Sequence, residues 1–284
     1  MTFRQPILTR NPVGMIASPV GTKKPRPPWI PLISMVWNRK AVATLGLSLS
    51  VVAIAAAMGA GVGTRLGWWD FRAGLKILNW AAYFGIAGLA VSLGGAIFTR
   101  PGSGRPGFPL AVAGIVLGAL AFGVPGNWYR VAKQVPRIHD ITTDTENPPV
   151  FVSVLPLRKD APNSAEYGGP EIAAKQRAAY PDIRPVEVGV RPMLVYESAL
   201  DIARRMGWQI VDGNPPEGRI EATATTRWFG FKDDVVIRIV PAAGSGSRLD
   251  IRSVSRVGIS DVGTNACRIR AFLKKFADET KSAR

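Results

Sequence analysis

Cysteine and histidine are almost absent from this sequence of 284 residues, which has one of each, Cys267 and His139. One cysteine makes no internal disulfide, so cysteine usage leaves the redox compartment open. We expect Cys267 to be a small buried side chain of the last helix. A structural zinc site uses about four Cys or His ligands. The counts exclude such a site and hydrolases that hold metals with several histidines, and we predict neither a metal nor a cofactor.

Acidic residues are scarce in the first half of the chain. Residues 1–40 contain seven Lys and Arg and no acid, and residues 41–128 contain five basic residues and one acid, Asp70. Residues 129–284 contain 24 basic and 19 acidic residues, so the net charge of +16 is not one basic surface of the kind that binds nucleic acid. The excess flanks apolar segments, a pattern typical of contact with anionic lipids. We therefore predict a bilayer partner and no nucleic acid.

Residues 1–40 are rich in proline, with the run KKPRPP at Lys23–Pro28, and show no helical period. We interpret them as a basic tail that is disordered or extended. Trp29 and Trp37 stand just before the first apolar run, where tryptophan suits a membrane interface.

Long uncharged runs fill the next part of the chain, residues 41–129. A helix of about 20 apolar residues crosses the hydrocarbon core of a bilayer. Three runs meet this length, at Ala41–Thr64, Ile77–Thr99 and Pro106–Tyr129. They predict a three-helix transmembrane anchor, in which Pro125 ends the third helix.

Small residues spaced four apart recur in these runs, at Gly59 and Gly63, Ala90 and Gly94, and Gly114 and Gly118. Such pairs allow close approach of helix backbones. We expect them to pack the three helices on one another, and the alternative is that they dock a helix of a partner protein.

The basic residues near the spans indicate an orientation. With the N-terminus in the cytoplasm, seven lie inside and six outside, and the ends of the first helix alone have five against three. We therefore predict a cytoplasmic N-terminus and a C-terminal domain on the outer side. The outer aromatic belt would then contain Trp68, Trp69, Trp128 and Tyr129.

From Arg130 the sequence is that of a soluble domain, residues 130–284. Helices are expected at Glu171–Ala179 and from Pro192 to Met206, the second closed by Gly207. Strands are expected at Val150–Leu155, Trp208–Val211, Arg219–Phe229 and Asp234–Val240. The last three are joined by short turn-forming links, which favours an antiparallel meander. One helix before the meander and one after it would cover one face, so the predicted class is α+β.

The stretch Arg248–Phe276 predicts a strand, a polar corner and the closing helix. From Leu249 the side chains alternate between two faces, and Gly258 ends the strand. Ser260 or Asp261 can cap the helix by accepting its free N–H groups. Within the helix one apolar stripe is expected, formed by Val262, Ala266, Ile269, Leu273 and Phe276.

The segments FKDDVVIRIVP and RLDIRSVSRVGISDVGTNACRIRAFL resemble the family of domains of unknown function numbered 1499. The residues that carry the resemblance are Arg252, Ser253, Ser255, Arg256, Gly258, Ser260, Asp261, Gly263, Asn265, Arg268 and Ile269. The resemblance covers about residues 138–276. It implies a membrane-anchored bacterial type, hence an inner-membrane protein with a periplasmic domain. Many members open with an Asn-Cys motif, which Ile138–Asp144 replaces here. The family has no established activity, so the resemblance implies no catalytic role.

His139, Asp140, Asp144 and Glu146 are the candidates for catalysis. A histidine beside carboxylates can act as a base or help to bind a cation, and a structural role in a loop is the alternative. A phosphohydrolase of the HD type needs further histidines. A Ser-His-Asp triad would have to use His139, yet the sequence has no G-x-S-x-G elbow.

The sheet face turned away from the helices is predicted to be open and charged. It carries Glu221, Thr223, Thr225, Arg227, Asp234, Arg238, Asp250, Arg252 and Arg256. Exposed cross-strand ion pairs, each worth about 0–1 kcal/mol, are one interpretation. In the other, Arg227, Arg238, Arg252 and Arg256 dock an anionic group of a partner protein, a phosphate or a lipid.

The strand–helix corner contains Gly258, Ser260, Asp261, Asn265 and Arg268. A helix N-terminus beside arginine can bind an anion, but Asp261 would repel one. We therefore predict a polar corner that stabilises the fold, in which Arg256 or Arg268 pairs with Asp261.

Together these patterns favour a non-enzymatic integral membrane protein that presents a binding or scaffolding domain to a membrane-protein partner or an anionic ligand. The alternative is a membrane-associated hydrolase or transferase with His139 as base.

Overall fold

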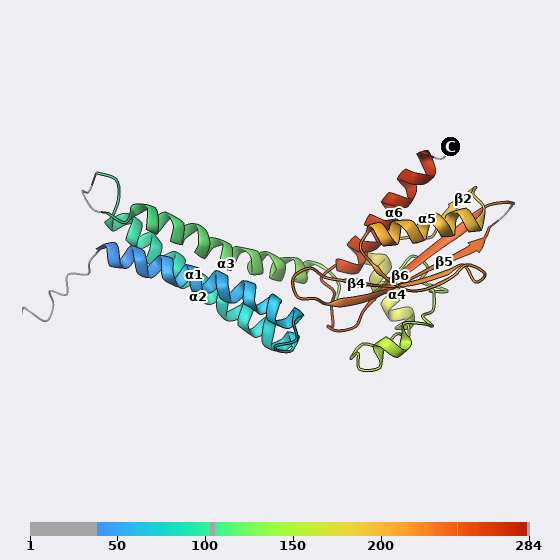
Figure 1. Cartoon of the computed structure of the whole chain (residues 1–284), viewed down its shortest axis with the longest axis horizontal. Helices are drawn as coiled ribbons and strands as arrows, with labels where there is room; N and C mark the ends of the chain where they lie inside the picture. The colour runs from blue at the N-terminus through green and yellow to red at the C-terminus, as the bar shows by residue number, and fades with distance from the viewer. Residues whose placement is uncertain (1–38, 103–105, 243, 283–284) are drawn as a thin grey trace, which may run out of the picture. The chain divides into compact units, whose positions relative to one another are not determined.

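A computed structural model of the chain describes residues 39–102, 106–242 and 244–282 (Figure 1). The predicted basic tail, with Trp29 and Trp37, lies outside these residues except for its last two positions. The elements that follow are an all-helical segment and then a mixed domain of strands and helices.

The helical segment consists of α1 (Arg39–Arg65), α2 (Phe71–Phe98) and α3 (Phe108–Gln134). All three are long and apolar enough to cross a membrane, as the sequence predicts. At the start of α2 the Asp70 carboxylate accepts the backbone N–H groups of Arg72 (2.7 Å) and Ala73 (3.1 Å). These bonds satisfy two donors that have no partner within the helix.

Pro125 lies inside α3, so the prediction that it ends the helix is wrong. A proline in a helix interior removes one backbone N–H donor and strains the preceding turn. Membrane helices tolerate this because neighbouring groups satisfy the carbonyl oxygen that is freed. The helix continues to Gln134, nine residues beyond Pro125.

The small residues divide into two groups by what they face. Gly118 is packed so closely that an added Cβ would lie 2.8 Å from both the Gly85 carbonyl oxygen and the Leu89 nitrogen of α2. Gly114 is packed as closely, and its carbonyl accepts the Ser50 hydroxyl (2.8 Å). Around Gly59 and Gly94 there is nothing within 4 Å, and Ala90 is exposed. The predicted close packing of helices is therefore right for Gly114 and Gly118 and wrong for Gly59, Ala90 and Gly94. Gly63 is closely packed too, but against the ring of Trp69, which precedes α2.

The domain is an α+β fold with an antiparallel sheet, as predicted. The strands are β1 (Asp140–Thr142), β2 (Val186–Val188), β3 (Gln209–Asn214), β4 (Arg219–Thr225), β5 (Lys232–Pro241) and β6 (Ser247–Ser255). The helices are the 3-10 turn η2 (Leu155–Arg158), α4 (Gly169–Ala179), α5 (Pro192–Arg205) and α6 (Thr264–Ser282). The order across the sheet is β1-β6-β5-β4-β3, and β2 also pairs with β6. The sequence patterns missed β1 and β2, and the strand predicted at Val150–Leu155 does not form.

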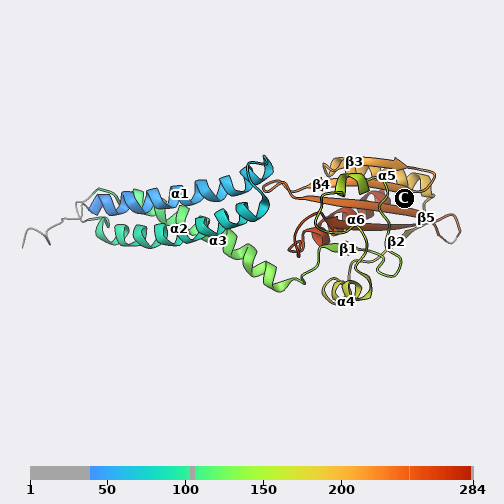
Figure 2. The ribbon, with the colours of Figure 1, turned by 90° about the horizontal axis from the view of Figure 1, so that it is seen from below.

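One face of the sheet forms the hydrophobic core with α5 and α6, which lie on the same side of it (Figures 1 and 2). The buried residues include Val195, Ala199 and Ile202 of α5 and Ala266, Ile269, Phe272 and Phe276 of α6. They meet alternate strand residues, such as Ile237 of β5 and Ile251 of β6. The two predicted covering helices are thus confirmed. The predicted stripe is wrong at Val262, which precedes α6 and has φ of +54°.

The close packing of Gly118 can be tested by adding one methyl group. We expect Gly118→Ala to lower the melting temperature of the detergent-solubilised protein, since forcing a side chain into a well-packed contact costs about 1–3 kcal/mol. Gly123→Ala, five residues later in α3, is the matched control, because an added Cβ there meets nothing within 4 Å. Equal melting of the two variants would show that the helices do not approach at Gly118.

Candidate functional site

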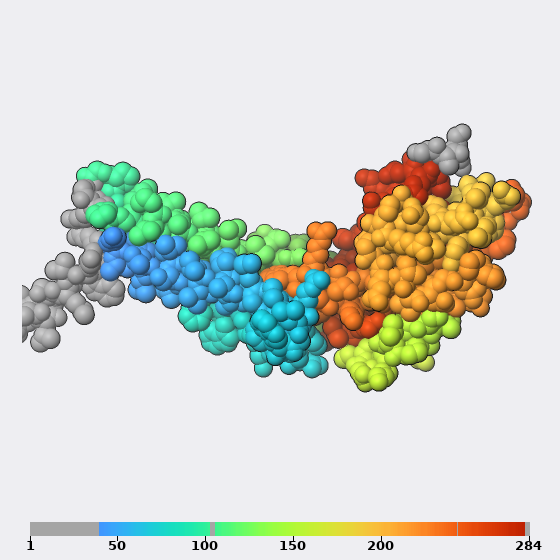
Figure 3. Space-filling model, viewed as in Figure 1, coloured from blue at the N-terminus to red at the C-terminus, as the bar shows by residue number. Residues whose placement is uncertain are grey.

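The charged face of the sheet is closed, so the prediction of an open face is wrong. Strand alternation does place Glu221, Asp234, Asp250 and Arg252 on the side away from α5 and α6, as expected. All four are nevertheless buried, and Arg252 is only 2% exposed. The cause is the chain between β1 and α4, residues 143–168, which we call the cover segment. Figure 3 shows part of it as a yellow-green layer at the lower edge of the domain.

Glu221 fastens the middle of the cover segment to the sheet. Its carboxylate accepts the backbone N–H groups of Val152 (2.9 Å), Ser153 (3.1 Å) and Val154 (2.9 Å). Arg219, its neighbour on the same face of β4, also bonds to it. The buried charge is thus matched by four donors, which offsets the loss of hydration.

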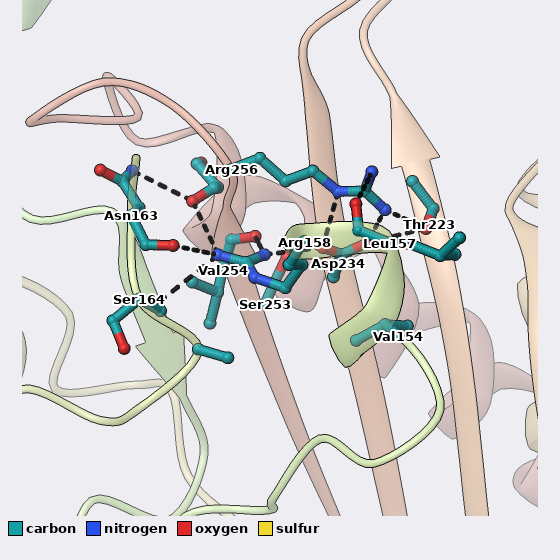
Figure 4. Close-up of polar contacts among 12 residues, drawn as sticks. Val154, Leu157, Arg158, Asn163, Ser164, Thr223, Asp234, Ser253, Val254 and Arg256 are labelled. Atoms are coloured by element: carbon teal, nitrogen blue, oxygen red, sulfur yellow. Dashed lines mark hydrogen bonds and ion pairs between the residues drawn. The ribbon is translucent and has the colours of Figure 1, made fainter. Parts of the chain in front are cut away.

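Asp234 binds two arginines at one end of this face (Figure 4). Arg158 of η2 donates from Nη1 at 2.6 Å, and Arg256 donates from Nε at 2.9 Å and Nη2 at 2.8 Å. The Thr223 hydroxyl is also 2.7 Å from the carboxylate. Burial acts to raise the pKa of Asp234, but the hydrogen bonds from Arg256, Thr223 and Arg158 outweigh it and lower that pKa. Asp234 therefore stays ionised and holds both guanidinium groups.

Arg252 is the central cation of the closed face. It reaches Asp140 from Nε (3.0 Å) and Nη2 (2.7 Å), and it donates to the carbonyl oxygens of Pro149 (3.1 Å) and Ala165 (2.8 Å). The aromatic rings of Phe151 and Tyr167, both in the cover segment, lie 5.2 and 5.4 Å from the guanidinium carbon. Arg252 therefore binds the cover segment at four points as well as the first strand.

The catalytic candidates His139, Asp140 and Asp144 do not form a single site. Asp140 is engaged by Arg252, whose bonds oppose but do not cancel the rise in the pKa of Asp140 that burial causes. Asp144 binds Arg248 (2.7 Å) and Arg238 (3.2 Å). The carbonyl oxygen of His139 accepts from the backbone N–H of Ser255 (3.0 Å).

Glu146, the fourth candidate, pairs with Arg177 of α4 at 2.6 Å. Across residues 39–102, 106–242 and 244–282, no group of three or more His, Cys, Asp or Glu is arranged to hold a metal ion. The three acids of the predicted cluster thus pair with different arginines: Asp140 with Arg252, Asp144 with Arg248 and Arg238, and Glu146 with Arg177.

The predicted docking arginines are mostly engaged within the domain. Arg238 binds Asp250 at 2.8 Å, while Arg252 and Arg256 bind Asp140 and Asp234. Arg227 differs, because it lies beyond the end of β4 in the β4–β5 turn and is exposed. An anion could reach Arg227 without breaking an ion pair described here, whereas it would have to displace a carboxylate from the other three.

The corner between β6 and α6 is polar and locally determined, as predicted. Gly258 has φ of +94°, a conformation that side chains oppose. Asp261 accepts the backbone N–H groups of Gly263 (2.9 Å) and Asn265 (2.6 Å), and the Ser260 hydroxyl accepts that of Val262 (3.2 Å). Burial raises the pKa of Asp261 although these backbone bonds oppose the rise.

The expected arginine partners of Asp261 bind elsewhere. Arg256 pairs with Asp234, and Arg268 pairs with Asp233 at 2.5 Å. The Asn265 side chain, which is buried, accepts from the Ser253 hydroxyl (2.7 Å) and donates to the His139 carbonyl (3.0 Å). The expectation that Cys267 is buried is also wrong, because its side chain is exposed.

The sequence patterns did not predict that the cover segment, residues 143–168, packs on the charged face of the sheet. Phe151 and Val154 are buried against Val236 and Val254 of the sheet. Arg158 directly follows the apolar run that ends at Leu157. In the sequence Arg158 belongs to the charged run Arg158–Asp160, which is typical of an exposed turn, so only its pair with the buried Asp234 explains why it points inward.

Replacing Arg252 should destabilise the domain strongly, contrary to what an open face would imply. Arg252→Ala leaves Asp140 buried without its cation, and breaking a buried pair in this way costs about 3–5 kcal/mol. Arg177→Ala is the control, since its pair with Glu146 is exposed on both sides and worth about 0–1 kcal/mol. Thermal melting of the purified variants measures the difference, and a small effect of Arg252→Ala would mean that the face is accessible to water.

Residues 140–276 match the family described as "Protein of unknown function (DUF1499)". A comparison with curated proteins gave no match. The matched residues run from the first residue of β1 into α6 and so include the whole sheet and the cover segment. The α+β domain of this chain is therefore a member of the DUF1499 family.

Proposed function

We propose that the chain is a multi-pass protein of a bacterial inner membrane whose α+β domain is a non-enzymatic binding or scaffolding module. The observation that supports this most is the closed polar face. Its acids are matched to Arg158, Arg252 and Arg256 and to backbone donors of the cover segment. Such groups stabilise a fixed shape, which suits a module that displays surfaces to another molecule.

A membrane-associated hydrolase or transferase with His139 as base is the second candidate. The observation in its favour is that His139 is partly exposed and directly precedes the buried carboxylate of Asp140. A general base needs a partner that orients its ring. Asp140, however, is directed to Arg252, with both carboxylate oxygens bonded there.

His139→Ala separates the two candidates. For a binding module we expect a cellular phenotype of a deletion strain to be rescued by His139→Ala at normal protein abundance. Arg252→Ala, which disturbs the fold, should fail to rescue and should lower abundance. Loss of rescue by a folded and abundant His139→Ala protein would favour catalysis. Purification in a mild detergent then identifies which protein or small molecule accompanies the chain.

The proposed periplasmic location can be tested at Cys267, the one cysteine of the sequence, whose side chain is exposed. In spheroplasts a membrane-impermeant maleimide should label the protein without lysis, because the N-terminus-in orientation puts the domain outside the cytoplasm. Cys267→Ser is the unlabelled control. Labelling that appears only after lysis would reverse the orientation.

A further inference from the structure

One end of the sheet is tied to the membrane by a short link. Five residues, 135–139, separate the end of α3 at Gln134 from the start of β1 at Asp140. Fully extended they span about 20 Å at most. The link lies along the end of β6, where the His139 carbonyl accepts from Ser255 (3.0 Å) and the Ile138 carbonyl accepts from Asp261 (3.2 Å). We call this the proximal end of the sheet.

The turn η2 lies at the same end. Arg158 reaches Asp234 near the start of β5 and the carbonyl of Val254 near the end of β6. The Leu157 carbonyl accepts from Arg256 at 2.9 Å. The β4–β5 turn is there too, because Thr225 at the end of β4 pairs with Lys232 at the start of β5.

Large apolar side chains are exposed at this proximal end. Leu155 and Leu157 of η2 are 46% and 53% exposed, and Ile259 of the β6–α6 corner is 67% exposed. We call these three residues the proximal rim. Exposed apolar side chains that gather in one region mark a surface that contacts another molecule or a membrane.

Basic side chains accompany the rim. The exposed charges of the link, of residues 155–160, of the β4–β5 turn and of the first residue of β5 are Arg137, Lys159, Asp160, Arg227 and Lys232. Four of the five are positive. Apolar residues interspersed with Lys and Arg are the composition of protein surfaces that lie in the interface of an anionic bilayer.

The β4–β5 turn also contacts the ends of the membrane helices. The Trp228 indole N–H donates to the Met58 carbonyl of α1 at 3.4 Å. The rings of Phe231 and Phe71, the first residue of α2, lie 6.1 Å apart edge to face. Met58 precedes the end of α1 at Arg65 by about two turns, so this part of the proximal end reaches the depth of the helix termini.

We infer that the proximal rim rests in the lipid interface of the bilayer that α1, α2 and α3 cross. Leu155, Leu157 and Ile259 enter the outer part of the acyl region, and Arg137, Lys159, Arg227 and Lys232 face anionic headgroups. Lipid is favoured over a protein partner because the short link keeps the rim close to a bilayer surface at all times. This contact does not depend on the proposed function, or on which side of the membrane the domain occupies.

The test uses the full-length chain in vesicles of phosphatidylcholine and phosphatidylglycerol. In a Cys267→Ser background, Leu157→Cys carries an environment-sensitive NBD probe. Met193→Cys is the matched control, because Met193 is 51% exposed and lies in the first turn of α5, at the opposite end of the sheet, near Ser247. Ile259→Cys provides a second rim position if labelling at Leu157 disturbs folding.

We expect NBD emission at Leu157 and Ile259 to shift to the blue and to be quenched by phospholipids with a nitroxide on the upper acyl chain. The probe at Met193 should show neither effect. Equal, water-like emission at all three positions would overturn the inference. A blue shift at the rim without lipid quenching would also overturn it, since that result means that protein and not lipid covers the rim.

Discussion

The structure of the domain depends on burying a layer of charge between the sheet and the cover segment. Removing carboxylates and guanidinium groups from water is costly unless each is paired and hydrogen bonded. Here Asp234 meets Arg158 and Arg256, and Arg252 meets Asp140 and two carbonyl oxygens. Because these bonds need exact partners from several segments, they select one placement of a segment that has little regular structure of its own.

The sequence patterns predicted the part of the fold that depends on period. Alternation along β4, β5 and β6 assigns their side chains to the correct faces of the sheet. The apolar stripes of α5 and α6 identify these two helices as the ones that cover the apolar face of the sheet. Pattern could not predict β1 or β2, because three residues are too short to show alternation. Nor could it place the cover segment, whose position is fixed by single contacts such as Glu221 with Val154.

The same distinction between local and distant contacts explains which contacts of the candidate site could be predicted from the sequence. Asp261 binds N–H groups two and four residues ahead, and that spacing is visible in the sequence. Arg268 binds Asp233, which is 35 residues away, and no spacing rule points to it. The prediction that His139, Asp140 and Asp144 form one catalytic site failed because their partners are distant in the sequence. Neighbours in sequence along an extended strand point to opposite faces, and Arg252 comes from the adjacent strand.

The cover segment connects the interior of the domain to the surface at its proximal end. Within η2, Arg158 turns inward to the pair of Asp234 and Arg256, while its neighbour Leu157 is exposed and offers its carbonyl oxygen to Arg256. A side chain at the rim and a buried ion pair are thus one residue apart. Because the ion pairs hold η2 in place, Leu155 and Leu157 are preorganised, and the inferred contact with lipid would cost little conformational entropy.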